Sequence, residues 1–139
     1  MLANTIMKQS LKHIAILVDD YDKAIAFYTQ QLQFILLEDT VLTHSKRWVL
    51  VSPSGVDGCS LLLAKATTVA QKASIGNQTG GRVFLFLHTD DFDKAYENLL
   101  VNKIKIVRQP TVETYGKVAV FEDIFGNIWD LIEPIPKPV

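Results

Sequence analysis

The sequence predicts an α+β fold built from two βαβββ modules that form curved mixed sheets around a cleft. Three observations support this prediction: one motif occurs twice, strand-like segments follow each copy in the same order, and glycine-bearing turns join the last two strands of each copy. Together they divide a single domain, 11–134, into module one (11–65), a linker (66–81) and module two (82–133).

The repeated motif reads Asp-Asp-aromatic-Asp-Lys-Ala at 19–24 and again at 90–95, which is 71 residues later. A short apolar strand pattern precedes each copy, and a helical period follows it. The aspartates stand directly before each helix, so we expect them to cap free backbone N–H groups. The apolar stripes of the two predicted helices are Tyr21, Ile25, Tyr28 and Leu32, then Phe92, Tyr96 and Leu99.

Three further strand-like segments follow each predicted helix, and short turns between them favour antiparallel neighbours. In module one the segments are 34–37, 48–51 and 60–63, and in module two they are 104–107, 117–121 and 128–132. The linker is rich in Ala, Thr, Gln and Gly. We interpret it as a solvated connector with one short helical turn, which could also shade a pocket.

The composition limits the partners and the cellular setting that can be expected for this chain. Apolar residues make up 48% of the 139 positions and the net charge is −1, so no basic field suggests nucleic acid or an anionic membrane as partner. Cys59 is the only cysteine, which rules out an internal disulfide and a multi-cysteine zinc site. We expect a reducing, cytoplasmic setting, because neither a signal peptide nor a membrane span is indicated.

Two segments carry a family resemblance. "HIAILVDDYDKAIAFY" opens module one and "FEDIFGNIWDLIEP" closes module two. With the two-module pattern, they resemble the vicinal oxygen chelate superfamily, which includes glyoxalase I, bleomycin-resistance proteins and extradiol dioxygenases. The resemblance covers about 11–134 and implies the fold, but it does not select one activity, because this fold hosts many.

The resemblance also implies four inward-facing positions that hold a divalent metal in the metalloenzymes. The repeat places them at His13, Leu62, Phe84 and Asp130. Two of these side chains are hydrocarbons, whereas divalent metals usually take three or more protein ligands. We therefore expect no cofactor, with a divalent metal at His13 and Asp130 kept as the alternative.

Asp130 is an acid within a bulky apolar strand, and burial of a carboxylate is costly unless it is paired. Arg82 or His13 is its expected partner, with a metal or water as alternatives. His13 and Asp130 are also the candidate catalytic acid–base groups. The alternative is that Arg82 is a solvated strand-entry residue and that His13 is a satisfied imidazole without chemistry.

Alternation along the strands predicts an apolar and aromatic cleft lining with a few polar groups, as in small-ligand pockets. Arg47 and Trp48 are expected at one end, for anion recognition and stacking, although Trp48 could instead belong to the core. The candidate substrate-binding residues are Arg47, Trp48, Leu62, Arg82, Phe84, Phe86, His88 and Tyr115.

Three functions remain open from the sequence. The first is a metal-free protein that binds a small organic molecule, like the bleomycin-resistance branch. The second is a metal-dependent lyase or dioxygenase whose metal shell is partly supplied by substrate. The third is a metal-free enzyme that uses His13 or Asp130 as an acid or base.

Because curved sheets leave edges that need covering, and because dimers are common in the family that the sequence resembles, a homodimer is expected.

Overall fold

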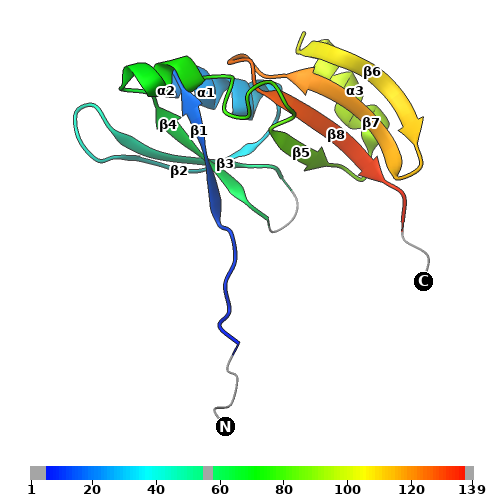
Figure 1. Ribbon diagram of the computed structural model, residues 1–139, viewed down its shortest axis with the longest axis horizontal. Coiled ribbons are helices and arrows are strands. Elements are labelled where there is room, and N and C mark those ends of the chain that lie inside the picture. The colour runs from blue at the N-terminus through cyan, green and yellow to red at the C-terminus, as the bar shows by residue number, and fades with distance from the viewer. Residues whose placement is uncertain (1–5, 55–57, 137–139) are drawn as a thin grey trace.

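The computed structural model describes residues 6–54 and 58–136. It contains two four-stranded mixed sheets, and each half of the chain runs strand, helix, strand, strand, strand. The predicted α+β fold of two βαβββ modules is confirmed. Figure 1 shows the two modules side by side, with the amino-terminal segment leading away from the body of the molecule.

The elements of each module follow in chain order. Module one contains β1 (His13–Val18), α1 (Tyr21–Ala26), its continuation η1 (Phe27–Gln31), β2 (Ile35–Val41), β3 (Arg47–Ser52) and β4 (Ser60–Lys65). A short helix, α2 (Val69–Ser74), lies between the modules. Module two contains β5 (Leu85–His88), α3 (Phe92–Val101), β6 (Lys105–Glu113), β7 (Gly116–Glu122) and β8 (Ile128–Pro134).

The two sheets have the same topology. Sheet A has the strand order β1-β4-β3-β2, and sheet B has the order β5-β8-β7-β6. In each sheet the first strand pairs in parallel with the last, and the remaining neighbours are antiparallel. The sequence repeat is therefore a structural repeat.

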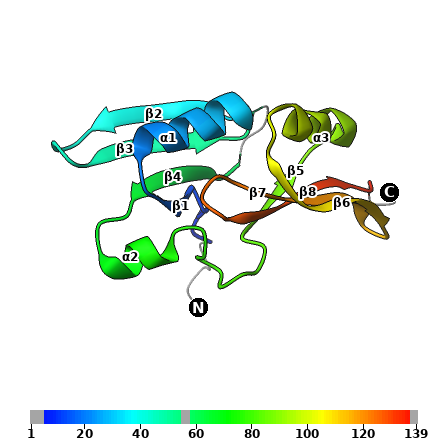
Figure 2. The same cartoon turned by 90° about the horizontal axis from the view of Figure 1, so that it is seen from above.

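The repeated motif starts both main helices, as expected. The Asp20 carboxylate accepts a hydrogen bond from the Lys23 backbone N–H at 2.8 Å, and the Asp91 carboxylate accepts one from the Lys94 N–H at 3.1 Å. Each aspartate thereby satisfies a backbone donor that has no partner within its helix. Figure 2 shows α1 over sheet A and α3 beside sheet B.

Two strands are longer than the sequence pattern indicates. β6 extends to Glu113, beyond the predicted end at Val107, and β2 extends to Val41. Irregular register on either side of Arg108 lets β6 continue through Pro110. β-Bulges and edge positions tolerate proline, because no ladder hydrogen bond from its nitrogen is needed there.

One hydrophobic core spans both modules on the helix-bearing faces of the sheets. The core joins the modules through Tyr28 and Phe34 of module one, whose rings contact Trp129 on β8. These aromatic contacts link the end of the first helix to the last strand of the chain.

Among the helices in the described part of the chain, none is long and apolar enough to cross a membrane.

Asp123, in the turn between β7 and β8, is a buried carboxylate at this junction. It accepts hydrogen bonds from the Tyr28 hydroxyl, the Trp129 indole N–H, the Asn127 side chain, and the backbone N–H groups of Phe125 and Asn127. Burial raises the pKa of Tyr28 well above its usual value, and the neighbouring Asp123 carboxylate adds to the increase, so Tyr28 remains a neutral donor. The junction is thus fixed by a polar network centred on Asp123 as well as by apolar packing, although the buried Asn127 Oδ1 atom has no hydrogen-bond partner among the described residues.

The linker contacts both modules. The Gln78 side-chain amide accepts a hydrogen bond from Leu17 N–H at 2.8 Å and donates one to the Ala15 carbonyl at 3.2 Å, so it takes the place of a neighbouring strand at the free edge of β1. Gly76 has φ +72°, and a Cβ there would lie 1.9 Å from the Phe125 carbonyl oxygen. Only glycine allows this close approach of the linker to the β7–β8 turn.

Candidate functional site

Each sheet has a helix-bearing face and an opposite face, which we call the open face. On β1, Ile16 and Val18 are fully buried in the core under α1. Because successive side chains alternate, His13, Ala15 and Leu17 lie on the open face. On β8, Trp129 and Leu131 belong to the core, so Asp130 lies on the open face of sheet B.

The open face of sheet A carries His13, one of whose ring nitrogens has a hydrogen-bond partner. The His13 Nδ1 atom lies 2.6 Å from the Ser60 Oγ atom on the neighbouring strand. The edge of the His13 ring contacts the half-buried Trp48 ring, with centroids 5.9 Å apart and an interplanar angle of 82°. Leu62 lies on the same face, between Ala15 on β1 and Leu50 on β3. The structure therefore brings His13, Trp48 and Leu62 onto one surface.

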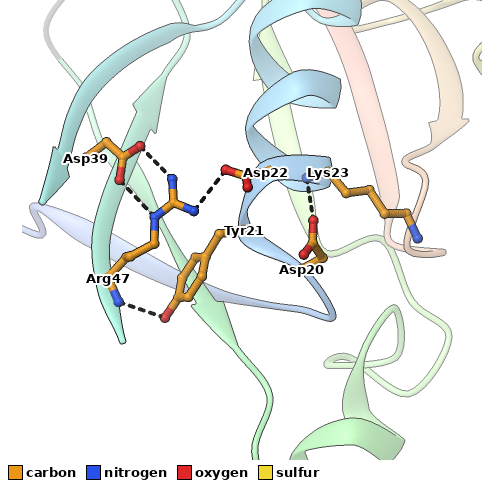
Figure 3. Close-up of polar contacts among 6 residues, drawn as sticks. All are labelled: Asp20, Tyr21, Asp22, Lys23, Asp39 and Arg47. Atoms are coloured by element: carbon orange, nitrogen blue, oxygen red, sulfur yellow. Dashed lines mark hydrogen bonds and ion pairs between the residues drawn. The ribbon is translucent and has the colours of Figure 1, made fainter. Parts of the chain in front are cut away.

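Arg47 does not join them. It precedes Trp48 on β3, so its side chain lies on the helix-bearing face, where Figure 3 shows it between Asp39 and Asp22. Its guanidinium lies 2.6 Å from the Asp39 carboxylate and 2.8 Å from that of Asp22, and it stacks 5.2 Å from the Tyr21 ring centroid. These carboxylates hold the pKa of Arg47 above its usual range. The predicted role in anion recognition is not supported, because its donors are engaged by β2 and α1.

The open face of sheet B carries Phe86 and Asp130, which pair directly across β5 and β8. The Phe86 side chain is 62% exposed, which is high for an aromatic ring in the middle of a strand. Asp130 is partly buried, and this burial raises its pKa above the ordinary value. An exposed ring thus lies beside a partly buried carboxyl group.

The charged neighbour of Asp130 is Arg108 on β6, which lowers the Asp130 pKa and so opposes the effect of burial. In the described residues Asp130 has no ion pair within 4 Å, so the predicted pairing with Arg82 or His13 is not present. Arg82 is exposed and lies before β5, with its carbonyl bonded to Thr79. Sequence reasoning missed Arg108 because the predicted strand-like segment ended at Val107, whereas β6 extends to Glu113.

The remaining residues that were predicted to line the cleft do not lie together. Phe84 precedes β5, is partly buried and packs against the hydrophobic core. His88 is exposed at the end of β5, and Tyr115 is 55% exposed in the turn between β6 and β7. Within the part of the chain that the structure describes, no hydrogen bond, ion pair or ring contact joins the His13 group on sheet A to the Asp130 group on sheet B. The structure therefore shows two open faces, each with its own set of candidate residues.

The residues at the four family metal positions do not fit a closed metal site. Leu62 and Phe84 have no lone pair to donate, and Phe84 packs partly buried against the core, so only His13 and Asp130 are ligand-type side chains. Within residues 6–54 and 58–136, no group of three or more His, Cys, Asp or Glu side chains is placed to hold a metal ion. Two ligand-type side chains fall short of the three or four that a transition metal needs.

A depression of about 560 Å³ lies on the helix-bearing side, at the junction of the modules. Its walls include Phe34, Leu131, Lys94 and His88. Its size suits a small molecule. However, its apolar floor belongs to the hydrophobic core that joins the modules, whereas Phe86 and Asp130 are not buried by any helix. The open faces are therefore the stronger candidates for binding.

Comparison with known proteins agrees with this architecture. A family model described as "Glyoxalase/Bleomycin resistance protein/Dioxygenase superfamily" matches residues 10–131. An uncharacterized protein of Shewanella frigidimarina (strain NCIMB 400) is 56% identical over 128 residues, which cover 91% of this chain and 95% of that protein. The protein YurT of Bacillus subtilis (strain 168) is 31% identical over 123 residues, covering 86% of this chain and 94% of its own.

Two solved structures are similar over almost the whole chain. UcmS2 has a TM-score of 0.79 and 28% identity, with coverage of 91% of this chain and 99% of its own. TnmS3, an antibiotic binding protein from Streptomyces sp. CB03234, has a TM-score of 0.76 and 27% identity, with coverage of 94% and 100%.

Proposed function

The chain belongs to the glyoxalase/bleomycin resistance protein/dioxygenase superfamily, and we propose that it binds a small organic molecule on its open faces without a resident metal ion. The observation that carries this proposal is the open face of sheet B. There, Phe86 is 62% exposed and pairs across the sheet with the partly buried Asp130. Small-molecule sites combine apolar and aromatic surface with a few polar groups that fix orientation.

The neighbouring residues supply an apolar floor for such a ligand. Val118, Val120 and Ile132 are buried but lie outside the core that packs under the helices. They alternate with core residues along β7 and β8, so they line the open face. The similarity to TnmS3, which its name describes as antibiotic binding, supports a binding role for this chain.

The enzymatic alternatives are less well supported. A metal-dependent lyase or dioxygenase would have to obtain most of its metal ligands from substrate, because the donor set here lacks them. A metal-free enzyme would use His13 or Asp130, and the raised pKa of Asp130 favours Asp130 as the acid–base group. Turnover in a compound panel, set beside simple ligand-induced stabilisation, separates a catalyst from a binding protein.

We also propose that the protein is a homodimer. Exposed apolar side chains along the β2 edge strand, including Ile35 and Leu37, support this proposal. Light scattering should give about twice the chain mass of 15.6 kDa at micromolar concentration. A mass of one chain would contradict the dimer.

The proposed function is tested by thermal shift against a panel of organic compounds, with wild-type protein and two variants. Phe86→Ala removes the exposed ring of the open face. Val112→Ala is the matched control, because Val112 is 79% exposed and pairs with Lys117, which lies on the helix-bearing face. We expect stabilisation by a ligand to be lost in Phe86→Ala and kept in Val112→Ala. If no compound stabilises the wild type, or if both variants respond alike, the proposal is wrong.

A further inference from the structure

Four side chains form one transverse row on the open face of sheet B. The strand registers pair Phe86 with Asp130, Asp130 with Val120, and Val120 with Arg108. Directly paired residues share a face of the sheet, so the row runs from an aromatic ring through an acid and an aliphatic residue to a base. The strands that carry these residues, β5, β8, β7 and β6, lie next to one another in Figure 1.

The two charges in this row are not paired with each other. In the described residues, no ion pair within 4 Å includes either Asp130 or Arg108. Adjacent strands are about 4.8 Å apart, so the two backbones are separated by roughly 10 Å, with Val120 between them. Val120 is buried, so the floor between the charges is apolar.

The next row of the same face differs. There, Lys105 on β6 pairs with Glu122 on β7, and the Lys105 Nζ atom lies 2.9 Å from the Glu122 carboxylate. That pair neutralises itself within the sheet. A carboxylate and a guanidinium in separate positions, each without such a partner, can instead be satisfied by a ligand of complementary charge.

We propose that this row binds an aromatic zwitterion, with the ligand ammonium on Asp130, its carboxylate on Arg108 and its ring against Phe86. The proposal rests on the proposed function, since it names the ligand class for the same open face. A ligand with one charge would leave either Asp130 or Arg108 partly covered without a partner, which costs free energy. A zwitterion satisfies both charges, and the long Arg108 side chain can reach across Val120 to meet it.

The test compares three probes that share one ring system: L-tryptophan carries both charges, tryptamine only the ammonium, and indole-3-propionate only the carboxylate. Isothermal titration calorimetry with wild-type protein should show that L-tryptophan binds at least about tenfold more tightly than either singly charged probe. Equal affinity for a singly charged probe would overturn the proposal.

Three variants test which protein side chain binds which charge of the ligand. Arg108→Gln should remove the preference for L-tryptophan over tryptamine, and Asp130→Asn should remove its preference over indole-3-propionate. Lys105→Gln, which removes a cation from the same strand and face, should leave both preferences unchanged. If Lys105→Gln acts like Arg108→Gln, the general charge of the face explains binding and the zwitterion assignment is wrong.

The two proposals fail in different ways. If none of the three indole probes binds at millimolar concentration, the zwitterion class is contradicted. The proposed function still stands in that case if another compound of the panel stabilises the wild type and not Phe86→Ala. If no compound does so, both proposals fail.

Discussion

The helix-bearing faces of the two modules repeat one arrangement. In module one, the cation at the start of β3, Arg47, pairs with Asp22 at 2.8 Å and lies 5.2 Å from the Tyr21 ring centroid (Figure 3). In module two, the cation at the start of β7, Lys117, pairs with Asp93 at 2.8 Å and lies 5.0 Å from the Phe92 ring centroid. In both modules a strand is thereby tied to the first turn of the helix that covers it.

The open faces differ instead. In module one His13 is hydrogen-bonded to Ser60, whereas in module two Asp130 has no hydrogen-bonded side chain or ion pair in the described residues. The contact between strand and helix therefore recurs in both copies, whereas the groups that could meet a ligand do not. This difference teaches that a repeated polar contact is evidence of structure, while an unrepeated and unpaired charge is the better guide to function.

The largest expected effect comes from the junction between the modules. Asp123→Ala should lower the free energy of unfolding by about 3 kcal/mol or more, because it leaves the buried Tyr28 hydroxyl and the Trp129 indole N–H without an acceptor. Urea denaturation measures this loss. Tyr28→Phe removes one donor and should cost only about 1–2 kcal/mol. A loss below 1 kcal/mol for Asp123→Ala would show that the modules are held by apolar packing alone.

The next effect compares the two strand–helix contacts. Arg47→Ala should cost about 1–2 kcal/mol, since the guanidinium bonds Asp39 through two nitrogens and its side chain is only 23% exposed. Lys117→Ala should cost about 0.5 kcal/mol or less, because Asp93 is exposed and the single pair is screened by water. Chemical denaturation of both variants gives the ranking.

The same two variants separate structure from binding. Neither Arg47→Ala nor Lys117→Ala should weaken ligand binding at temperatures where both are folded, because both side chains lie on the helix-bearing faces. A selective loss of ligand affinity in Arg47→Ala would restore the role in anion recognition that the sequence suggested.

The smallest effect concerns the pH dependence of Asp130. Its pKa is raised by burial, so the folded protein keeps this proton to a higher pH than the unfolded chain. The protein therefore loses stability as the pH rises from the ordinary Asp pKa of about 3.9 through the raised value. Asp130→Asn should be at least as stable as wild type at pH 7, and this advantage should shrink below about pH 4.

Melting temperatures measured at several pH values test this expectation, with Asp93→Asn as an exposed control. If Asp130→Asn is clearly less stable than wild type at neutral pH, the carboxylate has a stabilising partner that the geometry does not indicate.

The sequence predicted the fold well because the repeat, the helix caps and the apolar alternation are local patterns. It identified Asp20 and Asp91 as caps, and it placed His13 and Asp130 on faces opposite the core. It failed for Arg47, which Trp48 follows directly, because adjacent strand residues point to opposite faces and cannot share one cleft.

Arg108 and Phe84 show why the rest could not be read from the pattern. Arg108 lies opposite Val120 because the register of β6 shifts between Ile106 and Arg108, and register shifts of this kind are set by tertiary packing. Phe84 lies before the first paired residue of β5, and it is partly buried and packs against the core. Strand alternation with Phe86 does not predict this contact with the core.

The most direct test of the central claim is a crystal structure of the protein with the strongest ligand of the panel, grown in the presence of EDTA. The ligand should lie on the open face of sheet B against Phe86, with polar contacts to Asp130. A ligand in the helix-side depression beside Phe34 and Lys94 would contradict this account. So would binding that EDTA abolishes and that a divalent metal ion, held through His13 or Asp130, restores.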